Sequence, residues 1–324
     1  MSNDNIMHVL TKTVDILSEK ESLKGLYHEH RDGDPLPSAK ELEEIIDLAR
    51  AILFPGYFGK SSVNIHTIQY QIGVSMERLH KLLTQQILAG LCFGLMTDEC
   101  ECQSEIPCHE TASALALKVI EKLPEIRRIL ATDVEAAYNG DPAADSFSEI
   151  ISCYPVIKAL TNYRLAHELV LLGVPLIPRM MTEYAHSVTG IDIHPGATIG
   201  KYFFIDHGTG IVIGETTVIG NNVKIYQGVT LGALSTRGGQ ALKNKRRHPT
   251  IEDNVTIYSG ASILGGDTVI GKDVVIGGNA FITRSIPEGA KVSVKNQELR
   301  YNYDASKPVE RVDVETEAAW FYII

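Results

Sequence analysis

The chain has 324 residues, of which 44% are hydrophobic, and its formal net charge at pH 7 is −10. This length and apolar content allow two domains with a substantial core. The acidic balance argues against non-specific binding to nucleic acid, which needs clustered positive charge. No stretch approaches the ~18 to 20 consecutive apolar residues that span a bilayer. We therefore expect neither nucleic acid nor a membrane as a partner.

The N-terminal segment has no basic stretch leading into an apolar run, so it does not resemble a secretory signal. The chain holds five cysteines, an odd number, and we expect a cytoplasmic protein with reduced thiols. Three of them, Cys100, Cys102 and Cys108, lie just before His109. Their spacing is not that of a standard structural zinc site, so we expect free thiols, and the sequence assigns them no role.

Helical patterns fill the N-terminal part of the chain. Ser38 and Glu41 have the spacing of a capping box, in which each residue satisfies an orphan backbone donor of the helix start. An apolar face follows, and Pro55 with the next glycine ends that helix. Helical apolar stripes predict further helices at about 76–91, 111–138 and 155–172. We therefore expect an α-helical domain over residues 1–188.

From about residue 189 the apolar pattern changes to a six-residue interval. This interval fits neither an amphipathic helix nor an alternating strand, and it indicates a left-handed parallel β-helix with three short strands in each coil of ~18 residues. We predict an α+β protein with about five coils over residues 189–290; an irregular β-sandwich is the less favoured alternative. The aliphatic positions that follow the interval are Ile193, Ile199, Ile205, Ile211, Ile213, Ile219, Ile225, Leu231, Ile251, Ile257, Ile263, Val269 and Val275.

Two segments depart from the repeat. Residues 232–248 are rich in glycine and basic residues, and we expect a loop that leaves one corner of the β-helix and carries function. Residues 291–324 are predicted to form a polar, charged tail that ends in an apolar run closing on Ile324. A free carboxylate on an apolar residue is a docking signal, although such a tail could equally pack on its own protein.

Four segments resemble the bacterial serine acetyltransferases: DPAAD at 141–145, DIHPGATIG at 192–200, FIDHGTGIVIGET at 204–216 and RRHPTI at 246–251. The likeness covers roughly residues 135–285. Two features depart from the family: the loop before Arg247 is several residues longer, and the segment after Pro287 lacks a Pro-Ala-Arg element. The resemblance implies transfer of acetyl from acetyl-CoA to the hydroxyl of L-serine, the first step of cysteine biosynthesis. It also implies a homotrimer, or a dimer of trimers joined through the helical domain.

Acetyl transfer to an alcohol needs a base, and a neutral histidine can take the hydroxyl proton as attack begins. His207, in Asp-His-Gly-Thr-Gly, is the candidate. Asp192 precedes it by close to one turn of a coil of ~18 residues, so we expect the two side chains to be nearly stacked on adjacent coils. A carboxylate at the second ring nitrogen would fix the tautomer of the base. The family resemblance implies the same pair as the catalytic dyad.

The remaining site residues follow mainly from the resemblance. Arg247 matches the arginine that holds the serine carboxylate, for which a guanidinium is well suited. The histidine that matches His248 enters the site from a neighbouring subunit. Asp206 and Asp141 match residues of the serine pocket, and Glu215 matches a supporting residue. An ordinary solvated basic loop is the alternative for Arg247, and a helix cap is the alternative for Asp141.

Acetyl-CoA is the expected co-substrate, bound along the outside of the coil between two subunits, and no metal is expected. Gly232, Ser259 and Gly278 match family positions where small residues let backbone groups approach the pantetheine arm; tight corners would explain them equally well. Family members commonly insert a C-terminal isoleucine into O-acetylserine sulfhydrylase, so Ile324 is the candidate contact with that partner. L-cysteine resembles L-serine closely enough to be the expected feedback inhibitor.

Three other functions stay open at this point. One is acetylation of homoserine or a sugar. Another is a metal lyase of the γ-carbonic-anhydrase type, with His194, His207 and His248 as ligands at a subunit interface. The third is a non-enzymatic scaffold that acts through its tail.

Overall fold

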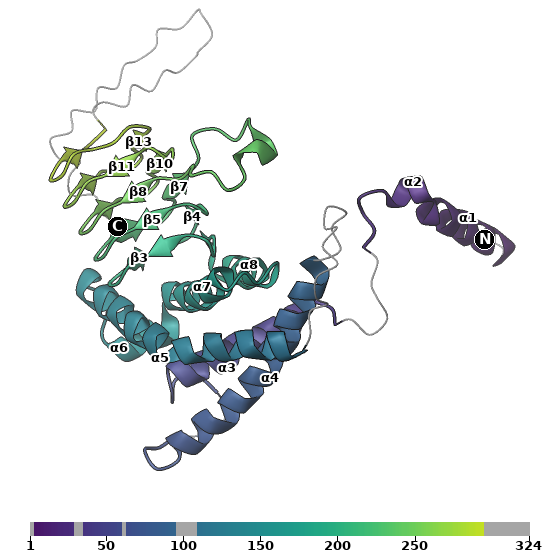
Figure 1. The fold of residues 1–324 in the computed structure, drawn as a ribbon. Coiled ribbons are helices and arrows are strands. Elements are labelled where there is room, and N and C mark those ends of the chain that lie inside the picture. Colours follow the sequence, from purple (N-terminus) through teal and green to yellow (C-terminus); the bar gives the residue numbers. More distant parts are fainter. Residues whose placement is uncertain (1–2, 29–34, 60–62, 95–108, 295–324) are drawn as a thin grey trace, which may run out of the picture.

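The computed structural model describes residues 3–28, 35–59, 63–94 and 109–294. Helices come first, and a stack of short strands follows them (Figure 1). Within the described ranges, none of the helices combines the length and the apolarity that crossing a bilayer requires. The helices are α1 Asn3–Ser18, α2 Lys20–Leu23, α3 Ala39–Leu53, α4 Ile68–Gly94, α5 His109–Gly140, α6 Phe147–Cys153, α7 Pro155–Leu171 and α8 Ile177–Thr189.

The start of α3 is a modified capping box. The hydroxyl of Ser38 accepts from the Glu41 amide at 3.3 Å, as the motif predicts. The return bond comes instead from α4: the Ser38 amide donates to Gln86 Oε1 at 2.8 Å. The Gln86 amide nitrogen in turn donates to the Glu41 carboxylate at 2.5 Å. The cap therefore ties α3 to α4 as well as beginning a helix.

The strands form three parallel sheets, which confirms the predicted left-handed β-helix of about five turns. Face 1 has the order β1-β4-β7-β10-β13, face 2 β11-β8-β5-β2, and face 3 β14-β12-β9-β6-β3. The strands are β1 Ile191–Ile193, β2 Thr198–Ile199, β3 Phe204–Asp206, β4 Ile211–Ile213, β5 Val218–Ile219, β6 Lys224–Tyr226, β7 Thr230–Gly232, β8 Thr250–Ile251, β9 Thr256–Ile257, β10 Ser262–Leu264, β11 Val269–Ile270, β12 Val275–Ile276, β13 Phe281–Ile282 and β14 Lys291–Val292. A short 3-10 helix, η1 Gly239–Leu242, lies between β7 and β8.

Some of the coils are longer than the ~18 residues expected from the repeat, although Ile213 pairs with Leu231 at the ideal interval. Ile191 pairs with Ile211, whereas the ideal repeat would place Thr209 opposite it. Later in the stack Ile263 pairs with Ile282 and not with Phe281. Because of the extra residues, the last core positions fall one residue later in the sequence than predicted. Ile270 and Ile276 are fully buried, whereas the predicted Val269 and Val275 are only half-buried. The six-residue interval holds between corners but not across every one.

One corner shows how the extra residues are accommodated. Tyr202, Asn222, Asn254 and Asp273 follow one another up the corner between faces 2 and 3, and all have φ between 55° and 61°. Asparagine tolerates this left-handed backbone better than most side chains. The Asn222 side-chain amide donates to Asn254 at 3.0 Å, and that of Asn254 donates to Asp273 at 2.9 Å. This amide ladder holds the corner together outside the apolar stack.

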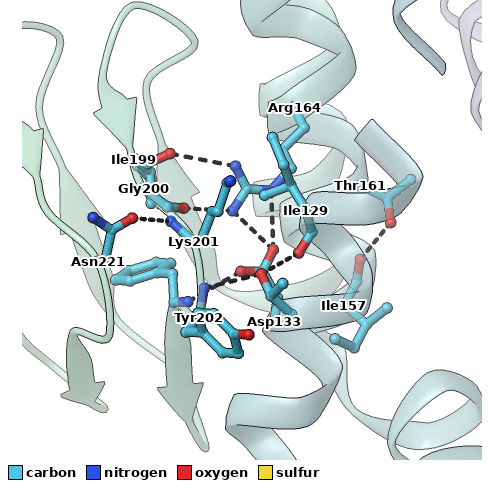
Figure 2. Close-up of polar contacts among 12 residues, drawn as sticks. Ile129, Asp133, Ile157, Thr161, Arg164, Ile199, Gly200, Lys201, Tyr202 and Asn221 are labelled. Atoms are coloured by element: carbon cyan, nitrogen blue, oxygen red, sulfur yellow. Dashed lines mark hydrogen bonds and ion pairs between the residues drawn. The ribbon is translucent and has the colours of Figure 1, made fainter. Parts of the chain in front are cut away.

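A buried ion pair joins the helices to the first coil (Figure 2). Arg164 of α7 contacts the carboxylate of Asp133 in α5 at 2.8 Å, and both side chains are almost completely buried. Arg164 also donates to the carbonyl of Gly200 at 3.0 Å, while Asp133 accepts from the Phe203 amide at 3.0 Å. Burial raises the pKa of Asp133 to about 6, although Arg164 acts in the opposite direction. The joint fixes where the end of α5 meets the β-helix.

Candidate active site

His207 lies at the corner between faces 3 and 1, directly after β3. Its side chain is 55% exposed, and its Nδ1 lies 3.8 Å from a carboxylate oxygen of Asp206. The backbone of His207 is left-handed, with φ 56°; for a residue other than glycine this is uncommon and often marks a functional position. Gly208 follows with φ 90°, where an added Cβ would lie 2.6 Å from Ile191. The tight turn therefore presents the imidazole outward.

Asp141 reaches the same corner from the helical domain, immediately after α5. Its carboxylate accepts from the Tyr154 hydroxyl at 2.5 Å and from the Ala143 amide at 2.8 Å. The bond from Tyr154 lowers the pKa of Asp141, and the charges of Lys224 and His207 add to that effect. The structure thus brings Asp141, Asp206 and His207 together, from segments far apart in the sequence. We call this group, with Tyr154 and Lys224, the His207 corner.

A second polar group lies at the corner between faces 1 and 2. Arg247 forms an ion pair with Glu215. Burial would raise the pKa of Glu215, but the bond and charge of Arg247 outweigh it and lower that pKa. The Thr216 hydroxyl accepts from the backbone amides of Arg247 and His248 at 3.0 and 3.1 Å, which fixes the end of the loop on the coil. We call this group the Arg247 corner.

His248 is the buried member of the Arg247 corner. Its Nδ1 lies 3.0 Å from the Thr216 amide and accepts that hydrogen bond. The ring lies so close to Gly214 that a Cβ there would sit 2.1 Å from His248 Cδ2. Burial, followed by the charge of Arg247, lowers the pKa of His248 to about 4. The imidazole is therefore neutral at pH 7, with its remaining proton on Nε2.

Asp192 lies on the outer side of face 1, between the two corners. Its neighbour on the next coil is Val212, whereas His207 comes earlier in the chain, at the corner before β4. Its nearest charged partner is Arg179, at 3.7 Å. Within the described part of a single chain, no hydrogen bond joins Asp192 to His207, and the two residues hold different positions around the coil. His194 lies toward the Arg247 corner, and burial with Arg179 lowers its pKa.

The positions expected for acetyl-CoA lie further along the coil. Gly260 donates to the Gln227 carbonyl, and Asn279 donates to the Ser259 carbonyl, at 2.9 and 2.8 Å. This ladder places Ser259 and Gly278 on the same corner as His207, one above the other along the axis. Gly232 ends β7 on face 1, where the long loop leaves the coil. Ser259 and Gly278 thus follow a line along the axis from the base, whereas Gly232 lies at the opposite edge of face 1.

Some predicted features lie outside the described residues or apart from the site. Ile324 and the cysteines at 100, 102 and 108 are outside the described ranges. The three histidines of the metal alternative divide between corners in one chain: His194 and His248 interact electrostatically, and His207 is on the other corner. Glu183, His186 and Asp192 could geometrically hold an ion, but Arg179 already pairs with both carboxylates.

Sequence reasoning missed three residues that build the two corners. Thr216 stands next to Glu215 in the Gly-Glu-Thr segment, so the motif could have indicated it. Tyr154 and Lys224 had no such signal, because neither lies in one of the four motif segments that resemble the family. Their roles follow only from the way α5 and α7 dock on the coil.

A comparison with models of known protein families gives no match. A serine acetyltransferase encoded on a plasmid of Synechococcus elongatus is 49% identical over 262 residues, covering 80% of this chain and 82% of the relative. The crystal structure of serine acetyltransferase 1 from Entamoeba histolytica in complex with L-cysteine is 36% identical with a TM-score of 0.67, covering 86% of this chain and 94% of that one.

Isoform 3 from the same organism, also in complex with cysteine, is 37% identical with a TM-score of 0.66, over 81% of this chain and 84% of that one. The sequence likeness and the shared fold extend over both the helices and the β-helix. These similarities do not favour the metal lyase or the non-enzymatic scaffold considered from the sequence. The chain belongs to the serine acetyltransferase family.

Proposed function

We propose that the chain transfers the acetyl group of acetyl-CoA to the hydroxyl of L-serine, using both corners of face 1. The observation that carries this proposal is their opposite chemistry. The His207 corner offers a base and two carboxylates, and the Arg247 corner offers a guanidinium and a neutral histidine. A zwitterionic hydroxy amino acid needs a carboxylate for its ammonium, a guanidinium for its carboxylate and a base for its hydroxyl.

The two corners lie on opposite edges of face 1, so one chain alone does not surround a small substrate. We infer that the His207 corner of one subunit meets the Arg247 corner of the next in a homotrimer. Cyclic trimers place the same two surface patches together at every interface. Each of the three sites would then contain residues from two subunits. A dimer of such trimers, joined through the helices, remains part of this proposal.

The reaction proceeds by direct transfer. His207 removes the serine hydroxyl proton as the oxygen attacks the thioester carbonyl carbon. The new C–O bond forms, the C–S bond breaks, and the CoA thiolate leaves and regains the proton from the imidazolium. Asp192 is proposed to orient His207 once subunits assemble, since within one chain it contacts Arg179. His248, neutral and fixed by Thr216, would donate from Nε2 to oxygen charge that develops during attack.

Acetyl-CoA would lie along the outside of the coil between two subunits, against Ser259 and Gly278 of the corner above His207 and against Gly232 at the opposite edge of face 1. Small side chains there let the amide-rich pantetheine arm approach the backbone. The thioester would thus reach His207 along the axis of the coil. L-serine, bound between the His207 corner and the Arg247 corner, would approach the thioester from the side.

Regulation and partners extend the same proposal. L-cysteine shares the ammonium and carboxylate of L-serine, and the Entamoeba structures hold cysteine; we propose competitive inhibition by L-cysteine. We also propose that Ile324 docks into O-acetylserine sulfhydrylase in the cytoplasm.

A thiol-release assay with acetyl-CoA tests the activity. L-serine, homoserine and a sugar are supplied in turn, with and without a chelator. We expect rapid release only with L-serine and no effect of the chelator. Turnover restricted to another acceptor would replace serine in the proposal, and loss of turnover on chelation would favour metal chemistry.

A further inference from the structure

The last residue of α5 docks on face 3. Lys224 of β6 donates from Nζ to the carbonyl of Gly140, the last residue of α5, at 2.5 Å. Gly140 must be glycine there, because a Cβ would lie 2.8 Å from the ring of Phe204. A cation at this end of a helix offsets the partial negative charge of its unpaired carbonyls. Lys224 therefore stabilises the helix end that carries Asp141.

Lys224 is enclosed as well as bonded. Its ammonium lies 5.1 Å from the ring centre of Phe204 and 4.9 Å from that of Tyr226. Cations over aromatic faces are attracted to the ring, more strongly when water is excluded. The same ammonium acts electrostatically on Asp141. The position of the ammonium is thus set by one carbonyl and two rings.

Tyr154 controls the other side of Asp141. It lies at the N-terminal end of α7, and its hydroxyl donates to Asp141 at 2.5 Å. Burial raises the pKa of Tyr154, and the bond to Asp141 raises it further, so it remains a donor. The charge of Asp206 acts on both Tyr154 and Tyr226. Two carboxylates thus share one small corner.

We propose that Lys224 and Tyr154 are positioning residues that hold the Asp141 carboxylate at the His207 corner, so that the enzyme selects hydroxy acids bearing an α-ammonium group. The inference rests on the proposed function and deepens it. The Tyr154 hydroxyl donates to Asp141, and Lys224 fixes the helix end that carries this residue. A carboxylate held in this way can accept a charge-assisted hydrogen bond from the ammonium of the acceptor. A hydroxy acid without an ammonium makes no such contact.

The test uses Lys224→Met with Lys291→Met as the matched control. Lys291 stands in the same outward column of face 3, through Thr256 and Val275, but at the far end of the stack. For each purified full-length variant, kcat and KM are measured with L-serine, with 3-hydroxypropanoate, which lacks the ammonium, and with acetyl-CoA. Circular dichroism and thermal unfolding report the fold.

We expect Lys224→Met to raise KM for L-serine about 10-fold or more, in line with loss of a charge-assisted contact. KM for acetyl-CoA and kcat should stay within about 2-fold. The preference for L-serine over 3-hydroxypropanoate should fall by a similar factor, and Lys224→Arg should recover part of it. A merely structural effect would change both acceptors equally.

Tyr154→Phe gives a second readout that survives if Lys224→Met misfolds. The hydroxyl of Tyr154 lowers the pKa of Asp141, so its removal should move the acidic limb of kcat/KM for L-serine to higher pH. Wild-type selectivity and pH profile in Tyr154→Phe, or in a folded Lys224→Met, would overturn the inference. Absence of serine acetylation by the wild-type protein would instead overturn the proposed function.

Discussion

The two corners of face 1 are assembled in different ways. The Arg247 corner comes from the coil itself and the loop that returns to it, and its histidine is buried and neutral. The His207 corner depends on helices: Asp141 and Tyr154 reach it from α5 and α7, and its histidine is largely exposed. One corner needs only the β-helix to form, whereas the other also needs the helical region docked correctly.

The largest effect on turnover should come from the His207 corner. His207→Ala removes the proposed base, and we expect kcat to fall by about 10²- to 10⁴-fold with the fold intact. His109→Ala, which alters an exposed histidine at the start of α5, is the control and should keep wild-type turnover. Steady-state thiol release measures both. Near-normal turnover in His207→Ala would remove this residue from the mechanism.

The buried ion pair between Arg164 and Asp133 tests whether the His207 corner depends on the docking of the helices. Asp133→Asn leaves the guanidinium of Arg164 buried without its anion, and breaking such a pair costs about 3–5 kcal/mol of stability. Urea unfolding should show this loss. The exposed pair Lys122–Glu125 offers a control: Glu125→Gln should leave the urea midpoint nearly unchanged, because solvent screens such a pair. Equal effects of the two variants would mean that the joint does not carry the docking.

Mixed trimers test whether the two corners complete one another. His207→Ala and Arg247→Ala chains, each nearly inactive alone, are co-expressed with different tags and isolated as mixed assemblies. In a closed ring of three that contains both kinds of chain, about one third of the interfaces have both residues intact. Activity should therefore return to roughly that fraction of wild type. No recovery in verified mixed assemblies would place both residues of a site on one chain.

The smallest effect concerns the pH dependence of stability at the Arg247 corner. The folded pKa of His248, about 4, lies below its usual value of 6.5. Below pH 6.5 the folded state therefore binds fewer protons at His248 than the unfolded state does. The contribution of His248 to the free energy of unfolding is fully present above pH 6.5 and is lost as the pH falls toward 4. Replacing His248 with Asn should flatten the pH dependence of the urea midpoint in that window. An unchanged slope would show that His248 titrates normally in the folded protein.

The sequence predicted the repeat well because each six-residue step leaves one apolar side chain facing inward. It did not predict coil length, because corner residues such as Asn222 and Asn254 carry no apolar signal. That error led to Val269 in place of Ile270. Asp192 and His207 are separated by less than a whole coil, so Asp192 lies on face 1 and His207 at the corner before β4. The motif residues Arg247 and His248 could be found, since a short contiguous segment carries them. Lys224 could not, because its role depends on which helix end lies above it.

The long loop has a consequence for how this enzyme can change. Thr230 and Ser262 remain direct neighbours on face 1 although the whole loop intervenes, and β8 after the loop pairs with β5 before it. The parallel ladder therefore closes around the departure point as if nothing had been inserted. Residues between η1 and Lys245 can be lengthened, shortened or exchanged while Thr216 still anchors Arg247 and His248. The coil thus offers a place where evolution or a designer can add new contacts without rebuilding the reaction centre.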